Sequence, residues 1–472
     1  MWGGSEVTMN ILSYRGPSAP GGVSATLSRV IERSTNEQQW WFLHGTALRK
    51  KGKRNANQEV CQIPFEIIEG HYRYCNEFLW PLLHELPQYA SFDESNRLMY
   101  QQLNMSYACN VLHSDETEAH QSIFINDYQL ALCPKFFNSS SYGAVDLFWH
   151  IPWPKTVEEQ FVPYLAEIAV GLLYAGKIGF HIEEYATNFL QFVKSHLPEY
   201  KADFAAREVM RGDGFAVKVV FHPLGVDSDY WMSKFRDESF VCRNVNIRSL
   251  DKRPFVLSVD RADYTKGVYE RLLAIEYFFS SNPDQIGAVT FVQVCQKTRA
   301  GLPGFDEYWE QCRCLFDSMN ARWASKDWAP IEWIDEPVSA NVLAWLYKRA
   351  SAMLITPLYD GLNLTAKEFA LCSEGGALIL SSRAGAWHEL SDNVLTLEDL
   401  RPESIAEKIC DALAMERKER RERLCRLREA VLGNTLALWW QNFGGNLRIA
   451  ERVLPLTVKV HHSTRRKAWS AN

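Results

Sequence analysis

The chain has 472 residues, more than one hydrophobic core usually covers, and its 47% hydrophobic and 23% charged residues are typical of a globular protein. A formal net charge of −6 argues against a partner such as nucleic acid or an anionic membrane. Because no apolar run is long enough to span a membrane and no signal-like segment opens the chain, we expect a cytoplasmic protein. The eleven cysteines form no paired CxxC motifs, which predicts free thiols and no metal site.

Short apolar runs alternate with longer amphipathic segments along the chain. This alternation is typical of parallel strands joined by crossover helices, and it predicts an α/β protein with doubly wound sheets. We expect strands at 7–14, 122–127, 145–150, 177–182, 217–222, 254–260, 288–295, 352–357 and 377–382. We expect helices at 157–174, 269–279, 306–319, 402–428 and 432–453.

A domain junction is indicated at 228–254, where charged and aromatic residues lack periodicity and a fresh strand follows. We therefore expect two Rossmann-like domains, 1–240 and 241–435, which face each other across a cleft that closes on its ligands. The remainder, 436–472, should cross back as a helix and end in a mobile basic tail. Ligands of such sheets bind at the carboxyl ends of the strands, and the motifs below fall there.

The first motif is VLSVDRADYTKGVYERLL. Its strand ends before Arg261 and the next helix starts near Gly267, so Arg261 and Lys266 should lie beside free helix amides. Two fixed cations suit a diphosphate leaving group, whose negative charge grows as its bond breaks. The alternative is a solvated loop with an Arg–Asp ion pair.

The second motif is ITPLYDGLNLTAKEFA, in which Pro357 ends a buried strand and a helix follows at once. Gly361 allows the backbone to approach a ligand closely, and Asp360 can accept hydrogen bonds from sugar hydroxyls. Glu368 lies one turn into the helix on the face of Leu364, where a carboxylate can hold a ribose diol. The alternative is an ordinary helix N-terminus, at which the acidic side chains only complement the helix dipole.

A third cluster of polar residues follows two strands of the first half. His150 precedes two prolines in DLFWHIPWP, and Asn126-Asp127 end the strand SIFIND. A histidine at such a point is more often structural than catalytic. Several strands that end in polar side chains nevertheless make a site more credible than any one of them does.

Six motifs occur in the same order in a known family. They are Gly21-Gly22, Leu79-Trp80-Pro81, Asp127-Tyr128, His150 to Pro154, Arg261 to Gly267 and Pro357 to Glu368. With them the chain resembles the trehalose-6-phosphate synthase family of retaining glycosyltransferases. The resemblance implies the GT-B fold, with an acceptor-binding first domain and a donor-binding second domain.

The resemblance also implies roles for the matched residues. It assigns Arg261 and Lys266 to the donor diphosphate, Asp360 and His150 to the donor sugar, and Glu368 to the ribose. The other donor-binding residues are Gly21, Gly22, Gly361, Asn363 and Leu364. The acceptor-binding residues are Arg15, His44, His71, Trp80, Asp127 and Arg299, of which Arg299 and Arg15 are assigned to the acceptor phosphate.

Enzymes of this family keep the anomeric configuration and react on one face of the sugar, with the leaving phosphate oxygen taking the acceptor's proton. The resemblance therefore implies no protein nucleophile, and the sequence offers cations rather than a glycosidase-type carboxylate pair. We expect no cofactor and no metal, because Arg261 and Lys266 compensate the leaving charge. The expected donor is UDP-, ADP- or GDP-glucose, and the expected partners are small-molecule substrates, with a homo-oligomer left open.

The sequence departs from the family pattern at three positions. His44 stands where the family has a tryptophan, and His71, one residue before Tyr72, stands where it has the acceptor-phosphate tyrosine. Tyr359 replaces a usual arginine. We expect glucose 6-phosphate as the acceptor, and glycerol 3-phosphate, the acceptor of the related glucosylglycerol-phosphate synthases, as the alternative.

Two further readings are disfavoured by residues that the chain keeps. Pseudo-glycosyltransferases lose parts of the donor-sugar motif, whereas Asp360 and Asn363 are present here. A catalytically silent regulatory domain would be free to lose the diphosphate cations, which are also present. A phosphorylase needs a pyridoxal phosphate lysine and a much longer chain.

Overall fold

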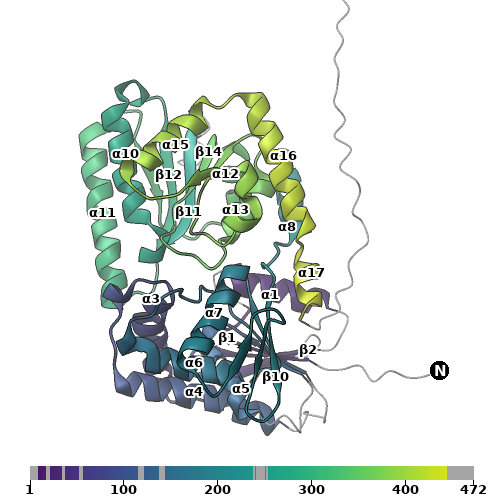
Figure 1. Cartoon of the computed structure of the whole chain (residues 1–472). Coiled ribbons are helices and arrows are strands. Elements are labelled where there is room, and N and C mark those ends of the chain that lie inside the picture. Colours follow the sequence, from purple (N-terminus) through teal and green to yellow (C-terminus); the bar gives the residue numbers. More distant parts are fainter. Residues whose placement is uncertain are drawn as a thin grey trace, which may run out of the picture.

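The computed structural model describes residues 9–17, 22–34, 38–52, 57–114, 122–137, 144–237, 240, 250 and 253–443. Gly21 and residues 444–472, which include the expected basic tail, lie outside these residues, and only the backbone of Gly22 is described. Two sheets form the centres of two domains, one drawn in purple to teal and the other in green to yellow (Figure 1). Among the described helices, none has both the length and the apolar character that a membrane span requires.

The first sheet has ten strands in the order β4-β3-β2-β1-β5-β6-β7-β10-β9-β8. The strands are β1 (Met9–Arg15), β2 (Gln38–His44), β3 (Ala47–Gly52), β4 (Gln58–Gln62), β5 (Ser122–Asn126), β6 (Val145–Phe148), β7 (Lys177–Phe180), β8 (Lys201–Asp203), β9 (Glu208–Met210) and β10 (Ala216–Phe221). The central six are parallel, and antiparallel strands close both edges. The order reverses between β1 and β5, which is where ligands bind in such sheets.

The helices of the first domain cover both faces of its sheet. They are α1 (Gly22–Arg33), α2 (Phe65–Arg73), α3 (Trp80–Leu83), α4 (Glu94–Leu112), α5 (Cys133–Phe136), α6 (Val162–Leu172) and α7 (Glu183–His196). The helices α2, α4, α5, α6 and α7 pack in succession on one face, and α1 contacts α17 on the other.

The second sheet is parallel throughout, with the order β13-β12-β11-β14-β15-β16. Its strands are β11 (Phe255–Ala262), β12 (Thr290–Lys297), β13 (Ile331–Ile334), β14 (Ala352–Ile355), β15 (Ala377–Ser381) and β16 (Leu395–Leu397). The strand β14 is apolar along its whole length and fully buried, as expected of a strand covered on both faces. This sheet reverses its order between β11 and β14.

Two groups of helices sandwich the second sheet. The first group is α10 (Val268–Ser281), α11 (Pro303–Trp323) and α15 (Pro402–Ala414), which pack on one another. The second group is α8 (Ser228–Arg236), α12 (Ala340–Arg349), α13 (Leu364–Cys372) and α16 (Arg417–Gly433). The expected single helix at 402–428 is wrong, because Met415 and Glu416 are extended and divide it into α15 and α16.

The end of the described chain returns to the first domain. Figure 1 shows α16 running along the second domain and α17 (Leu436–Gln441) reaching the first. A new helix starts there because Thr435 caps it, and its side chain accepts from the amide of Leu438. The rings of Trp439 and Phe443 then meet Phe148 edge-on, with centroids 5.0 Å apart in each pair. The expected helix 432–453 is thus interrupted, and its part beyond 443 lies outside the described residues.

Candidate active site

The loops that follow β11 and β14 are locked to each other by one buried arginine. Arg271 of α10 has no exposed surface and donates to Asp260 at 2.6 Å and to Gln293 and Thr356 at 3.0 Å. Gly267 starts α10 with φ 62°, and a Cβ there would lie 2.0 Å from the carbonyl oxygen of Thr356. The two strand ends at which the second sheet reverses therefore have a fixed separation.

Lys266 and Asp360 meet between these two loops. The Lys266 ammonium lies 2.6 Å from the Asp360 carboxylate, and Asn363 donates to the same oxygen at 3.1 Å. Burial opposes ionisation of Asp360, but Lys266 and Asn363 outweigh it, so the pKa of Asp360 is lowered. The predicted cation and the predicted sugar-binding carboxylate are thus in contact, and a bound phosphate would share Lys266 with Asp360.

The charges of two other arginines act on Arg261. Burial lowers the pKa of Arg261 most, and the positive charges of Arg299 and Arg15 lower it further. The negative charge of Asp263 acts in the opposite direction. Among the described residues, no side chain is hydrogen-bonded to Arg261. Three arginines therefore gather in a protein of formal net charge −6, and this local positive charge favours an anionic ligand.

Asp263 connects the two domains below this cluster. The Asp263 side chain has no exposed surface. One of its carboxylate oxygens accepts from Trp80 Nε1 at 3.3 Å and from the Thr265 hydroxyl at 3.0 Å. The other oxygen accepts from Arg299 at 2.5 Å. Burial acts against the carboxylate, yet Arg299 prevails and holds the pKa of Asp263 well below its usual range. The Arg299 guanidinium also lies 4.1 Å from the centre of the Trp80 ring. Two predicted acceptor residues are thus brought together by a carboxylate that the sequence analysis did not single out.

A short π-helix positions another residue that the sequence analysis missed. Tyr74–Leu79 form π-helical turns directly before α3, and such turns occur frequently at functional sites. Asn76 within them donates to the carbonyl oxygen of Tyr72 at 2.7 Å and accepts from Arg299 at 2.5 Å. The only available signal was its place three residues before the Leu79-Trp80-Pro81 motif.

His150 belongs to a chain of hydrogen bonds whose direction is set by a peptide group. The amide of Leu224 donates to His181 Nδ1 at 3.2 Å, so His181 Nε2 carries the proton that is shared with His150 Nδ1 at 3.3 Å. His150 Nε2 then donates to Asn126 at 2.7 Å. Burial lowers the pKa of His150 to about 3, so the ring is neutral. Both ring nitrogens are bonded within the protein, and a contact with the donor sugar requires the Asn126 bond to be exchanged.

Asp127 supports the same loop from the next strand. Its backbone has φ 74°, and one carboxylate oxygen accepts from the amides of Tyr128 at 2.9 Å and His150 at 3.0 Å. Burial raises the pKa of Asp127 to about 6, although both amide bonds act against this shift. Asp127 therefore shapes the backbone at the end of β6 in addition to its predicted place in the acceptor pocket.

Gly361 is required by a close contact with the backbone of the first domain. A Cβ on Gly361 would lie 2.2 Å from the carbonyl oxygen of His150 and 2.8 Å from the Cα of Ile151. Next to it, the Tyr185 hydroxyl donates to the carbonyl oxygen of Asp360 at 3.0 Å. The loop after β14 thus rests directly on the first domain.

Glu368 lies on α13, one turn after the capping residue Asn363. The Asn363 side chain accepts from the amide of Ala366 at 3.2 Å, and the helix then carries Leu364, half-buried, and Glu368 on one face. Tyr347 donates to Glu368 at 3.1 Å. Burial raises the pKa of Glu368 to about 7, against the pull of Arg29 of the first domain.

Comparison with known proteins identifies the family. Residues 25–448 match the model of glycosyltransferase family 20. The chain belongs to this family. The protein is therefore a glycosyltransferase, and it has the GT-B fold of the solved structures that it resembles.

Several relatives of this family 20 glycosyltransferase have names that describe their activity. A bifunctional trehalose-6-phosphate synthase/phosphatase of Thermoproteus tenax is 33% identical over 399 residues, which cover 83% of this chain and 53% of that protein, so the chain spans about half of that relative. A UDP-forming alpha,alpha-trehalose-phosphate synthase of Candida albicans is 27% identical and covers 91% of this chain and 92% of its own. The structure of the Burkholderia xenovorans synthase in complex with glucose-6-phosphate has a TM-score of 0.83 and 25% identity, covering 92% and 98% of the two chains.

His71 of this family 20 enzyme does not line the site, and its predicted acceptor role is corrected. The side chain has no exposed surface and is stacked between Tyr14 and Tyr100, with ring centroids at 4.9 and 5.2 Å. Its Nε2 lies 2.9 Å from the carbonyl oxygen of Gln129, and burial lowers its pKa to about 4. His71 is therefore a core residue, which two aromatic rings separate from any ligand.

Tyr72, the neighbour of His71, faces the arginines instead. Burial raises the pKa of Tyr72, and Arg299, Arg15 and Arg261 act against this rise in that order, so the phenol lies within their field. The one-residue shift follows from the helical geometry of α2, in which consecutive residues point about 100° apart. Tyr72 is thus the residue of this pair on which the charges of the three arginines act.

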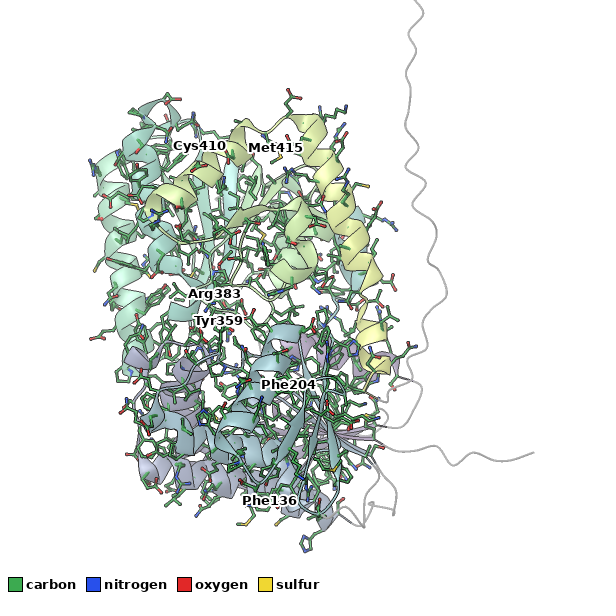
Figure 2. All side chains as sticks on the ribbon, viewed as in Figure 1. Phe136, Phe204, Tyr359, Arg383, Cys410 and Met415 are labelled. Carbon is green, nitrogen blue, oxygen red and sulfur yellow. The ribbon has the colours of Figure 1, made fainter. Side chains whose placement is uncertain are left out.

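The other two departures from the family pattern lie at the edge of the site. His44 ends β2 with an exposed side chain, next to Leu43, which pairs with Arg15. The Tyr359 ring is covered by the guanidinium of Arg383 at 4.2 Å, and Figure 2 shows both side chains where the two domains meet. A cation from another loop therefore lies beside the position where the family pattern has an arginine.

Proposed function

We propose that this family 20 enzyme transfers glucose from UDP-glucose to glucose 6-phosphate and forms trehalose 6-phosphate with retention of configuration. The observation that carries the proposal is the cluster of Arg15, Arg261 and Arg299 beside the Lys266–Asp360 pair. It lies where two phosphorylated substrates can meet between the domains. The names of the relatives and the complex of the Burkholderia xenovorans synthase with glucose-6-phosphate support the choice of substrates.

The donor is bound by the second domain. Arg261 and Lys266 bind the diphosphate, Asp360 accepts from the sugar hydroxyls, and Glu368 accepts from the ribose diol. The amides at the start of α1 add to the diphosphate site. Uracil is proposed as the base because the fungal relatives are named UDP-forming.

The reaction needs no protein nucleophile. The bond between the anomeric carbon and the diphosphate oxygen breaks, and the acceptor hydroxyl forms the new bond on the same face. Its proton passes to the departing phosphate oxygen, so atoms and charges balance without a protein base. Arg261 and Lys266 stabilise the negative charge that develops on the diphosphate, and they are already in place before the reaction.

The acceptor phosphate is bound by Arg299, with Arg15 and Tyr72 beside it. Arg299 is held on three sides by Asp263, Asn76 and the Trp80 ring, so its free edge has a fixed orientation. Glycerol 3-phosphate is the second candidate acceptor, because the exposed His44 replaces a larger aromatic residue at the rim of the pocket.

The test is release of nucleoside diphosphate from UDP-, ADP- and GDP-glucose, each offered with glucose 6-phosphate, with glycerol 3-phosphate or with no acceptor. Release from UDP-glucose that depends on glucose 6-phosphate is expected. Release only with glycerol 3-phosphate would show that glycerol 3-phosphate, and not glucose 6-phosphate, is the acceptor. Release only from ADP- or GDP-glucose would show that the donor base is not uracil. Silence with every pair would reject the proposal.

A further inference from the structure

His84 is a buried histidine between the two halves of the site that has no role in the reaction described above. It ends α3, four residues after Trp80, and its side chain is 2% exposed. Its Nδ1 lies 2.7 Å from the carbonyl oxygen of Trp80, and the centroids of the two rings are 4.1 Å apart. Its charge environment comes from the second domain, since Asp263, Lys266 and Asp360 all act on it.

The hydrogen bond to Trp80 fixes the tautomer of His84. A carbonyl oxygen only accepts, so Nδ1 carries the proton and Nε2 presents a lone pair. Burial lowers the pKa of His84 to about 4, against the bond to Trp80 and the charge of Asp263. The ring is therefore neutral near pH 7, and Nε2 is a hydrogen-bond acceptor that holds no proton. Among the described residues, none is hydrogen-bonded to this nitrogen.

Other hydrogen-bond acceptors beside His84 are already engaged by the protein. Both oxygens of Asp263 accept from side chains, one from Trp80 and one from Arg299. The Oδ2 atom of Asp360 is shared by Lys266 and Asn363. The acceptor side thus offers cations for a phosphate but few free atoms for the hydroxyl protons of a sugar besides the second carboxylate oxygen of Asp127, to which no described group is hydrogen-bonded. His84 Nε2 is an unengaged acceptor at this position.

We propose that His84 Nε2 accepts a hydrogen bond from a hydroxyl of the acceptor sugar and thereby orients it against Trp80. The inference rests on the proposed function, because the hydroxyl belongs to glucose 6-phosphate. It assigns the ring to the acceptor rather than to the donor, since the Trp80 ring, which lies against His84 at a tilt of 38°, also carries Arg299, the acceptor-phosphate residue. A ring of such low basicity holds the hydroxyl without taking its proton.

Two variants separate the two nitrogens of His84. In His84→Asn the side-chain amide can replace Nδ1 and keep the bond to Trp80, but nothing replaces Nε2. In His84→Gln the longer side chain can place an amide oxygen near the Nε2 position. We expect His84→Asn to raise the KM for glucose 6-phosphate about tenfold with the KM for UDP-glucose unchanged, and His84→Gln to recover most of this loss.

A measurement on the unmodified enzyme covers the case in which His84→Asn fails to fold. With ¹⁵N-labelled histidine, the Nε2 resonance of His84, identified by its absence in His84→Gln, should move upfield when glucose 6-phosphate binds and stay in place with UDP alone. The inference would be overturned if glucose 6-phosphate left the Nε2 resonance unmoved. It would also be overturned if His84→Asn had a normal KM for glucose 6-phosphate or a raised KM for UDP-glucose. If the unmodified enzyme does not use glucose 6-phosphate at all, the proposed function fails instead.

Discussion

The proposed donor half and the proposed acceptor half of the site are built in different ways. The donor half comes from two loops whose residues contact one another, with Lys266 on Asp360 and Arg271 tying both strand ends. The acceptor half is assembled from β1, the π-helix, α3 and the loop after β12, and much of it is organised by Asp263 of the second domain. Local motifs therefore specify the donor half, whereas the acceptor half exists only once the domains are joined.

Arg271→Met tests the locked donor half and should have the largest effect. It leaves Asp260 as a buried charge without its partner, which costs about 3–5 kcal/mol of folding free energy. Thermal unfolding with circular dichroism measures the change. The matched control is Arg401→Ala, whose ion pair with Asp399 is exposed and should not matter. Unfolding temperatures that agree for both variants would contradict the locked loops.

Arg261→Ala and Lys266→Ala test the charge that faces the leaving group. Each should lower turnover by about 10²–10³-fold with the fold intact, because a preorganised group that stabilises developing charge is lost. Steady-state release of UDP measures this loss. Near-normal turnover in both variants would refute the assignment of these residues to the diphosphate.

The titration of Glu368 should make the binding of UDP-glucose, but not that of glucose 6-phosphate, depend on pH. The pKa of Glu368 is about 7, so the ionised fraction falls as the pH drops below 7, and a protonated carboxyl accepts less well from the ribose diol. The KM for UDP-glucose should therefore rise by up to about tenfold per pH unit below 7, while the KM for glucose 6-phosphate does not follow it. Glu368→Gln should remove this dependence, and a slope that persists in the variant would assign it to another group.

The ion pair between Arg383 and Glu85 should contribute least. The two side chains meet across the domains at 2.9 Å, but Arg383 is 45% exposed, so its loss should cost less than about 1 kcal/mol. Thermal unfolding of Arg383→Ala at low and high salt measures it. A large loss of stability would show that contacts at the rim, rather than the buried contacts of Asp263, hold the domains together.

The geometry of the proposed donor half follows from the sequence more directly than that of the proposed acceptor half, for physical reasons. RADYTKG and PLYDGLNL each place their residues within one strand-to-helix turn, where spacing alone decides which side chains meet. His71 was assigned wrongly because an ungapped register does not reveal which residue of α2 faces the core. Asn76, Asp263 and His84 depend on contacts between segments far apart in the chain, as with Arg299 and Asn76.

The fold shows the same division between local and distant determinants. The nine expected strands all correspond to strands of the two sheets, because each is a short apolar run between breakers. Strands near the edges of the first sheet, such as β3 with the sequence ALRKKG, were missed because they carry charged residues where the expected pattern is apolar. The break between α15 and α16 has no glycine or proline, and it is imposed by packing, since α15 lies on α10 and α16 on α13.

The most direct test of the account is the configuration of the product. UDP-glucose and glucose 6-phosphate are incubated with the enzyme, and the anomeric protons of the disaccharide phosphate are read by NMR. An α,α linkage is expected, because the leaving group and the acceptor occupy the same face of the sugar. A β linkage, or free glucose in place of a disaccharide, would contradict the account.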